Sequence, residues 1–542
     1  MNRPLKLLLT TVFIVVTALF SSANDIYVAQ NSAGNNTGAD CADAYAVAWF
    51  NSPANWGSNA GQIGPGTTVR LCGTFNAPAG ASGYLTFHGS GASGSPITVL
   101  FENGAVLTAV YWSGPAVNLN GESYVTVDGG NGGTIEATAN GTSLANQQDN
   151  GVCVNNGTPA GNSQNVVVQN LTCANLYVDA SMSDNGGEDT YGIDIWNVSN
   201  LTLKNNTIHD VKWAIRNSYA TGSTFTNALT MTGNTVYNMD HCYFMTDSNS
   251  SGAAIASGFY IYGNSCGSMT NWDNTADNNH HDWFHLNANS ASSRFSKFYI
   301  YNNTNSGDVG ANANSGMFTN EGGQSTSNVS SVYFFNNVFV NTSSNHCFAD
   351  GFISWDGAGM LLAANNTFLG NSTSCVNNGS NSSGDNGIAY EGGSVNLQLE
   401  NNIMHSMGNT FVYTNGGGTS ITTANNNDYY TGGGWTWLSD GNTADFATWK
   451  NWCACDSAAT IGNPLLTGAY HLTNSSSAAW QKGTNLYQTC SGQPSPGLGA
   501  LCFDAAGVAR PSSGAWDMGA FEDSASGGSA PNPPTGLAAA VQ

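Results

Sequence analysis

The sequence repeats one short unit many times, and this repetition restricts the possible folds more than any other feature. From Tyr191 to Asn217, an alternating apolar and polar run is followed by a pair of asparagines, a short loop and a second alternating run. Alternation with a period of two is typical of half-buried strands, and asparagine is favoured in turns. Because one such unit cannot bury its apolar face alone, the units are expected to stack.

The unit recurs from about residue 95 to about residue 430, with asparagines roughly 28 to 39 residues apart. In a stack of coils, these asparagines lie above one another at a turn, where each side chain can bond the backbone of its neighbour. The asparagines expected to stack in this way are Asn170, Asn206, Asn234, Asn264, Asn303, Asn337, Asn366 and Asn402.

The order of strand, asparagine turn, loop and glycine-led strand resembles the coil of pectate-lyase-like proteins. The resemblance implies an all-β fold: a right-handed parallel β-helix, or single-stranded solenoid, with an N-terminal cap and a C-terminal closing coil. The stretch from Arg510 to Glu522 is similar to the closing coil of many secreted β-helix proteins. The superfamily includes lyases, hydrolases, epimerases and non-catalytic adhesins, so the fold does not determine the activity.

The ends of the chain differ in composition from the repeats. Residues 1–23 carry Arg3 and Lys6 ahead of an apolar run, which predicts a secretory signal peptide, with an uncleaved anchor as the alternative. We expect residues 24–523 to form the β-helix domain, with its C-terminal cap at about 431–523. Residues 524–542 are rich in Gly, Ser and Pro and predict a linker or tail. The protein is therefore expected to be secreted or on the cell surface, with no membrane insertion after signal cleavage.

The charge balance restricts the possible partners. The chain has 11 Lys and Arg against 34 Asp and Glu, for a net charge of −23. Phosphate contacts require clustered basic residues, so this balance argues against nucleic acid as a partner. A polysaccharide is the partner that we expect, and a monomer is the expected state.

The cysteines number 12, and in an exported protein they are expected to form disulfides. Cys453 and Cys455 are too close together for the usual zinc spacing. Pairing between sequence neighbours would join Cys41 with Cys72, Cys153 with Cys173, Cys242 with Cys266, Cys347 with Cys375, and Cys490 with Cys502.

Basic and imidazole side chains concentrate on one strand of each coil. If Ile193, Ile215, Phe244 and Phe284 point inward as anchors, the next residue of each strand points outward. Neighbouring coils lie about 4.8 Å apart, so side chains from successive coils can share one cleft. The candidate catalytic residues on this face are Lys212, Arg216, His241, His281 and His285.

These residue types suit the cleavage of a uronate-containing polysaccharide by β-elimination. A base removes the proton beside the carboxylate, and a cation stabilises the carbanion. Lys212 or His281 is the candidate base, and Arg216 would neutralise the carboxylate or protonate the leaving oxygen. The resemblance to lyases of this fold adds calcium as a candidate cofactor. Because calcium prefers oxygen ligands, its candidate ligands are Glu188, Asp189 and Asp240.

Other readings of the same residues stay open. A glycoside hydrolase needs two carboxylates, and Asp194, Asp240, Asp247 and Asp282 offer several pairs. A non-catalytic surface or matrix adhesin would leave the same side chains scattered and solvated. The run from His280 to His285 is either a polar strand edge or a transition-metal site. The candidate substrate-binding residues are Trp196, Trp213 and Trp283, whose rings suit sugar faces, with Asp194, Asp247 and Asn287.

Overall fold

A computed structural model gives the three-dimensional structure of the protein. The predicted signal peptide and the C-terminal tail lie outside the described residues. The structure describes residues 25–139, 151–157, 162–176, 190–220, 222, 224–247, 253–269, 280–290, 292–320, 328–355, 359–371, 373–377, 380–382, 384–390, 396–408, 410–414, 421–430, 437–439 and 442–523.

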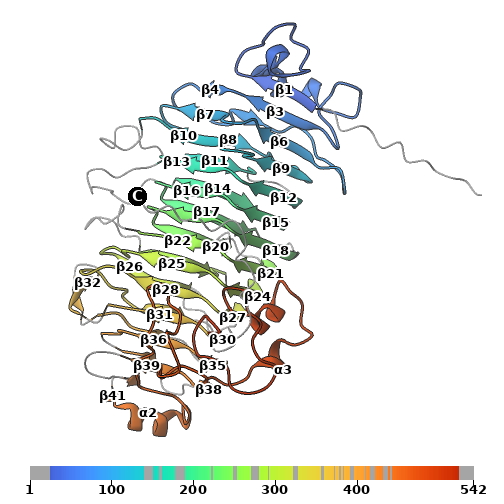
Figure 1. Ribbon diagram of the computed structural model, residues 1–542. Coiled ribbons are helices and arrows are strands. Elements are labelled where there is room, and N and C mark those ends of the chain that lie inside the picture. The colour runs from blue at the N-terminus through green and yellow to red at the C-terminus, as the bar shows by residue number, and fades with distance from the viewer. Residues whose placement is uncertain are drawn as a thin grey trace, which may run out of the picture.

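Nearly all strands in the described part of the chain belong to three long sheets, which run the length of the molecule (Figure 1). Sheet 1 contains β1 (Asp25–Ala29), β2 (Tyr45–Ala46), β3 (Thr68–Cys72), β6 (Ile97–Phe101), β9 (Val125–Asp128), β12 (Ser163–Gln169), β15 (Val198–Lys204), β18 (Thr224–Thr232), β21 (Ile255–Tyr262), β24 (Arg294–Tyr301), β27 (Val329–Phe335), β30 (Met360–Ala364), β35 (Asn396–Glu400) and β38 (Ile421–Asn425). Sheet 2 contains β4 (Thr74–Asn76), β7 (Val106–Ala109), β10 (Thr134–Ala137), β13 (Thr172–Ala174), β16 (Thr207–His209), β19 (Thr235–Tyr237), β22 (Ser265–Cys266), β25 (Thr304–Gly307), β28 (Val338–Asn341), β31 (Thr367–Leu369), β36 (Ile403–His405) and β39 (Asp428–Tyr430). Sheet 3 contains β5 (Leu85–Thr86), β8 (Pro115–Asn118), β11 (Val152–Asn155), β14 (Tyr191–Trp196), β17 (Trp213–Tyr219), β20 (His241–Asp247), β23 (His281–Asn287), β26 (Ala313–Asn320), β29 (Gly351–Trp355), β34 (Ile388–Tyr390), β37 (Val412–Thr414), β40 (Trp437–Ser439) and β41 (Asn442–Ala444).

Each coil supplies one strand to each sheet, and each strand pairs in parallel with its equivalent in the next coil. Thus Leu201 of β15 pairs with Leu229 of β18. The two antiparallel pairs are β40 with β41 and a small excursion, β32 (Cys375–Asn377) with β33 (Ser380–Ser382). The prediction of a parallel β-helix is confirmed. The coils begin at β3, earlier than the expected residue 95, because the short strands β4 and β5 carry little alternation.

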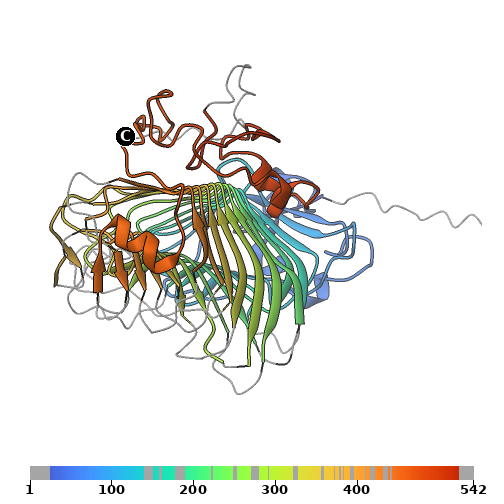
Figure 2. The same ribbon diagram turned by 90° about the horizontal axis from the view of Figure 1, so that it is seen from below.

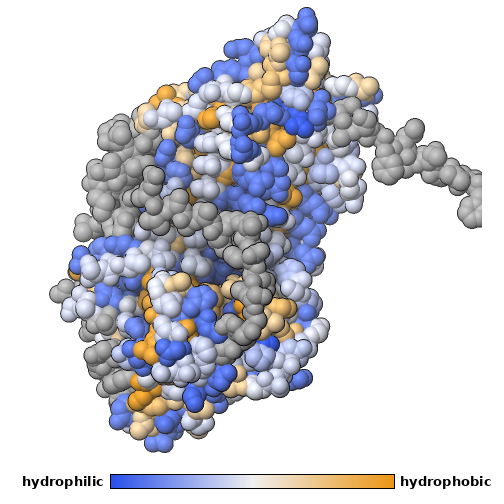
Figure 3. Space-filling model, in the orientation of Figure 1, coloured by the Kyte–Doolittle hydropathy of each residue, from blue (hydrophilic) through white to orange (hydrophobic). Residues whose placement is uncertain are grey.

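The core lies inside the coils and follows from the alternation of the strands. In β15, Leu201 and Leu203 are buried, whereas Lys204 is exposed. Equivalent side chains stack from coil to coil, as in Phe259 against Phe298, whose ring centroids are 4.2 Å apart. On the face shown in Figure 3, hydrophobic residues are interspersed with hydrophilic ones.

The turn between sheets 1 and 2 contains the predicted asparagine stack. Each side-chain amide donates to the Oδ1 of the next asparagine and to a backbone carbonyl one coil away, as Asn303 does to Asn337 and Ile261; the last amide, of Asn427, donates to Asp456 instead of an asparagine. Asn170 was expected in this stack but does not belong to it. With a φ of 56°, it lies in the outer row of the turn, which is formed by the positive-φ residues just before the stacked asparagines, such as Asn302. The stack itself begins at Asn206, whose Oδ1 accepts a hydrogen bond from Leu171 N. The stack consists of Asn206, Asn234, Asn264, Asn303, Asn337, Asn366, Asn402 and Asn427, all buried.

The two ends of the solenoid are covered by different elements. At the N-terminal end, η1 (Cys41–Asp43), α1 (Val47–Phe50) and η2 (Pro53–Asn55) bring the rings of Phe50 and Trp56 together over the first coils. At the C-terminal end, α2 (Phe446–Cys453) packs Trp449 into the core. No helix that the structure describes has the length and hydropathy needed to cross a bilayer.

The segment expected to be the closing coil has a different position. Residues 484–522, including α3 (Tyr487–Cys490) and η4 (Leu498–Cys502), lie along the flank of the solenoid (Figure 2). The buried Arg510 donates to Asn336 Oδ1 and pairs with Glu522 at 2.9 Å. Arg510 thus ties this segment to the turn at Asn336. The turns of the next two coils also contact the segment, where Asn365 donates to Asp517 O and Asn401 accepts from Thr484 N.

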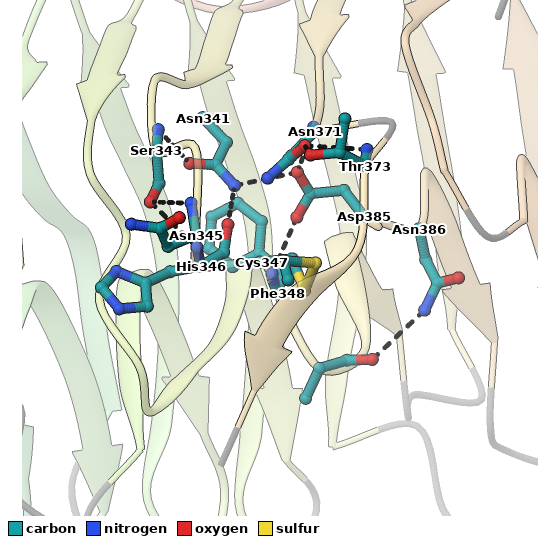
Figure 4. The surroundings of a disulfide bond; sticks show 12 residues. Asn341, Ser343, Asn345, His346, Cys347, Phe348, Asn371, Thr373, Asp385 and Asn386 are labelled. Carbon is teal, nitrogen blue, oxygen red and sulfur yellow. Dashed lines mark hydrogen bonds between the residues drawn. A yellow bond between two sulfur atoms is a disulfide. The ribbon is translucent and has the colours of Figure 1, made fainter. Parts of the chain in front are cut away.

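All five predicted disulfides are present, and Cys453 pairs with Cys455. Figure 4 shows the surroundings of the bond between Cys347 and Cys375. The carboxylate of Asp385 is buried there and accepts hydrogen bonds from Phe348 N and Asn341 Nδ2.

Candidate functional site on the outer face of sheet 3

The strands of sheet 3 depart from simple alternation near their starts. Two consecutive residues point inward, as Cys242 and Tyr243 do in β20: Cys242 forms a disulfide with Cys266 of sheet 2, and Tyr243 is fully buried. Two outward rows result. Row 1 contains Tyr191, Trp213, His241 and Asp282, and row 2 contains Asp194, Arg216, Phe244 and His285.

This double inward step corrects two assignments. Tyr243, in register with Ile215 and Phe284, is the inward anchor of β20, and Phe244 points outward instead. Trp283 occupies the other inward position of β23, where it packs against Phe339 and is fully buried. A tryptophan inside the core cannot stack on a sugar ring, so its predicted role in substrate binding was wrong.

Lys212, Asp240, His241 and His281 form a buried polar cluster at the start of row 1. All four side chains are essentially inaccessible to solvent. Oδ1 of Asp240 lies 3.0 Å from His241 Nδ1 and 3.9 Å from His281 Nε2. Burial alone would raise the pKa of Asp240, but His241, His281 and Lys212 hold that pKa below its ordinary value. The cluster therefore carries an ionised carboxylate among cationic and imidazole groups.

A second cluster is centred on Asp282 and shares His241 with the first. Oδ2 of Asp282 lies 3.0 Å from His280 Nε2, 3.3 Å from His241 Nε2 and 3.6 Å from His285 Nδ1. Burial opposes the charged form of His241, yet Asp240 and Asp282 raise its pKa to about 9. Burial lowers the pKa of His285 well below its usual value. Neighbouring imidazoles in this cluster thus have opposite shifts.

Arg216 lies on the same face, in row 2, and is held in place by two neighbours of the preceding coil. Its guanidinium donates to both carboxylate oxygens of Asp194, at 2.7 and 2.8 Å, and to Tyr191 OH at 2.6 Å. The guanidinium also lies over the Tyr191 ring, 3.8 Å from its centroid. Arg216 is one coil from His241, and its side chain is 20% exposed. Asp194 is therefore an ion-pair partner that fixes Arg216.

The other predicted substrate-binding residues differ in their surroundings. Trp213 is half-buried and stacks on His241 with 4.3 Å between ring centroids, and Trp196 is half-buried beside Asp194. Asn287 is half-buried at the end of β23. Asp247, by contrast, is buried and accepts hydrogen bonds from the backbone of the loop at 289–290, so its predicted contact with substrate is replaced by a structural role.

Two of the three predicted calcium ligands fall on a part of the chain that the structure does not describe. Glu188 and Asp189 lie outside the described residues. Around Asp240, the described neighbours that face its carboxylate are two imidazoles and Lys212. Calcium takes six to eight oxygen ligands. The described surroundings of Asp240 therefore do not fit calcium.

Three residues of the site are not among the catalytic and substrate-binding residues that the sequence predicts. The sequence offers Asp282 only as a hydrolase carboxylate and His280 only as part of a metal site, and it does not single out Tyr191. The sequence feature that points to Tyr191 is its position two residues before the anchor Ile193. The equivalent position is occupied by Trp213 in the next coil and by His241 in the coil after it. A register that includes the double inward step would have placed Tyr191 and Asp282 in row 1.

Comparisons with known proteins give matches at the level of structure. No protein-family model and no curated protein matches the sequence. Among solved structures, the chain is similar to pectate lyase Pel9A, with 14% identity over 92% of this chain and 97% of that chain and a TM-score of 0.45. It is also similar to a rhamnogalacturonan lyase, with 12% identity over 70% and 87% and a TM-score of 0.33. A third similar structure is the GH136 lacto-N-biosidase from Eubacterium ramulus, with 10% identity over 81% and 68% and a TM-score of 0.29.

The architecture of the chain itself establishes the fold. Its three long sheets are parallel, each coil supplies one strand to each sheet, and an asparagine stack occupies the turn between sheets 1 and 2. These features are the ones from which the sequence predicted the fold. In fold, the chain is a parallel β-helix.

Proposed function

We propose that the protein is a secreted polysaccharide lyase that cleaves a uronate-containing polymer by β-elimination on the outer face of sheet 3. The observation that carries the proposal is the convergence of Lys212, His241, His281 and His285 on two buried carboxylates, with Arg216 one coil away. The adhesin alternative predicts the same side chains scattered and solvated, whereas Lys212, His241, His281 and His285 are buried. Six disulfides support an oxidising destination.

The chemistry requires a base and a positive environment for the developing charge. The base takes the proton beside the uronate carboxylate, the electron pair forms a carbon–carbon double bond, and the glycosidic oxygen leaves with a proton. Lys212 or His281 serves as the base. Arg216 faces the carboxylate, where fixed positive charge stabilises the carbanion. In a chain with a net charge of −23, Lys212, Arg216 and His241 supply the positive charge that suits an anionic sugar.

The hydrolase alternative is weaker because its carboxylates are engaged elsewhere. Asp194 binds Arg216 through both oxygens, and Asp247 holds the loop at 289–290. Asp240 and Asp282 are buried beside histidines. A carboxylate that already holds an ion pair or a loop would have to give up that contact to act as the acid or base of hydrolysis.

A panel of uronate-containing and neutral polysaccharides tests the proposal. Elimination gives an unsaturated uronate with ultraviolet absorbance as well as new reducing ends, whereas hydrolysis gives reducing ends alone. Lys212→Ala and His281→Ala identify the base, and loss of the base should lower the rate by about 100-fold or more. Lys204→Ala is the matched control, since Lys204 is exposed on sheet 1.

The outcomes separate the alternatives. Reducing ends without absorbance would favour hydrolysis, and no product from any polymer would favour the adhesin. Full activity in both the Lys212 and His281 variants would remove the site from the proposal.

A further inference from the structure

Four side chains of sheet 3 direct one ligand atom each towards a common point. The atoms are Nε2 of His241, Nε2 of His280, Oδ2 of Asp282 and Nδ1 of His285, and all lie within 4.8 Å of one another. His241 comes from β20 and the others from β23 and the residue before it. Ligand atoms around a single ion in a tetrahedral site lie about 3.3 Å apart, as expected for metal–ligand bonds of about 2.0–2.1 Å.

A second observation points to a ligand at this position. Oδ2 of Asp282 is buried and has no hydrogen-bond partner among the described residues, although three imidazole nitrogens lie 3.0–3.6 Å away. Nε2 of His280, 3.0 Å from that oxygen, is likewise without a hydrogen bond in the described part of the chain. Buried polar atoms without partners are costly, so such atoms call for an explanation. An ion at the centre of the cluster would satisfy all of them.

The surroundings of the four side chains hold them in a fixed geometry. Oδ1 of Asp282 accepts a hydrogen bond from Ser315 N at 2.8 Å, which orients the carboxylate. The other nitrogen of His241 lies 3.0 Å from Asp240, the arrangement in which a carboxylate fixes a metal-binding imidazole. His285 packs against the rings of Phe244 and Phe318.

We propose that His241, His280, Asp282 and His285 bind a divalent first-row transition-metal ion of the zinc class. Three imidazoles and one carboxylate are donors that suit such ions, whereas calcium and magnesium require oxygen. The side chain of His280 is 41% exposed and supplies an entry path from solvent. The metal site would therefore share His241 and His285 with the proposed lyase site.

The test measures metal rather than turnover. Protein without a histidine tag is stripped with a chelator, incubated with Zn²⁺ or Co²⁺, desalted and analysed for metal content. We expect one ion per chain, visible absorption bands of bound Co²⁺, and no displacement by excess Ca²⁺. His241→Ala and His285→Ala should each lose most of the bound metal, and Asp240→Asn should weaken affinity by about 10–100-fold.

His209→Ala is the matched control, because His209 also pairs with a neighbouring aspartate but lies on sheet 2. It should retain one ion. Circular dichroism confirms that each variant is folded. The wild-type chain, tested with and without chelator, provides a measurement that depends on no variant.

Folded wild-type protein that retains no Zn²⁺ or Co²⁺ would overturn the proposal, as would equal retention in the His241 and His285 variants. Metal binding without polysaccharide cleavage would leave this site standing and remove the lyase proposal. Cleavage by wild-type protein that retains no Zn²⁺ or Co²⁺ would leave the lyase proposal standing and remove this site.

Discussion

At the scale of single residues, Asp385 shows how burial of one carboxylate makes stability depend on pH. Burial raises the pKa of Asp385 to about 6, although hydrogen bonds from Asn371 N, Phe348 N and Asn341 oppose the shift (Figure 4). The folded state therefore keeps its proton to a higher pH than the unfolded state does. The free energy of unfolding should fall as pH rises from about 4 to about 6, by roughly 3 kcal/mol, and level off above that.

Asp385→Asn removes this titration, so the variant should lose about 3 kcal/mol less than the wild type between pH 4 and pH 7. Denaturant unfolding at the two pH values measures the difference. The control is Asp40→Asn, an exposed N-cap of η1 where asparagine caps equally well. Identical pH dependence in wild type and Asp385→Asn would contradict the assignment.

The same scale shows which features of the site could be predicted. Lys212, His241, His281 and His285 are rare residue types that recur at or beside the same strand of successive coils, which made them predictable, and the structure brings them together. Trp283 was misplaced because a double inward step is invisible in a run of apolar residues. Tyr243 and Phe244 are both apolar, so alternation alone does not decide which of them points inward.

At the scale of the coil, the asparagine stack should carry a large share of the stability of the turn. Oδ1 of Asn303 accepts from both nitrogens of Asn264, and its amide donates to Ile261 O and Asn337. Asn303→Ala leaves several of these buried groups without partners. Unsatisfied buried groups cost about 1–3 kcal/mol each, so we expect a loss of about 3 kcal/mol in the free energy of unfolding.

Asn302→Gly provides the comparison within the same turn, since Asn302 has a φ of 54° that glycine adopts freely. This variant should change stability by less than about 1 kcal/mol. Equal losses in the two variants, measured by denaturant unfolding, would mean that the buried asparagine stack has no special role in the stability of the turn.

The stack was predictable because its signal is local: each asparagine follows its own strand. Asn170 was misassigned because both rows of the turn use asparagine.

At the scale of the whole molecule, the sheets were predictable and the packing of the C-terminal segment was not. Stacking follows from a repeated local pattern, whereas the flank contact joins Arg510 to Asn336, 174 positions away. A motif that resembles a closing coil does not specify which surface it covers. The stacked rings of Tyr301 and Phe335 lie under this segment, so the outer face of sheet 1 is apolar where the segment covers it.

Arg510 is the residue on which this attachment should depend. Both it and Glu522 are fully buried, and removing one partner of a buried ion pair leaves an uncompensated charge. Arg510→Met should therefore cost about 3–5 kcal/mol and release residues 484–522 while the coils stay folded. Arg70→Met is the control, because the partly exposed pairs of Arg70 with Asp25 and Glu102 should contribute at most about 1 kcal/mol each. Hydrogen exchange should rise over 484–522 in the Arg510 variant alone; a rise spread evenly through the β-helix would show instead that the segment and the coils unfold as one unit.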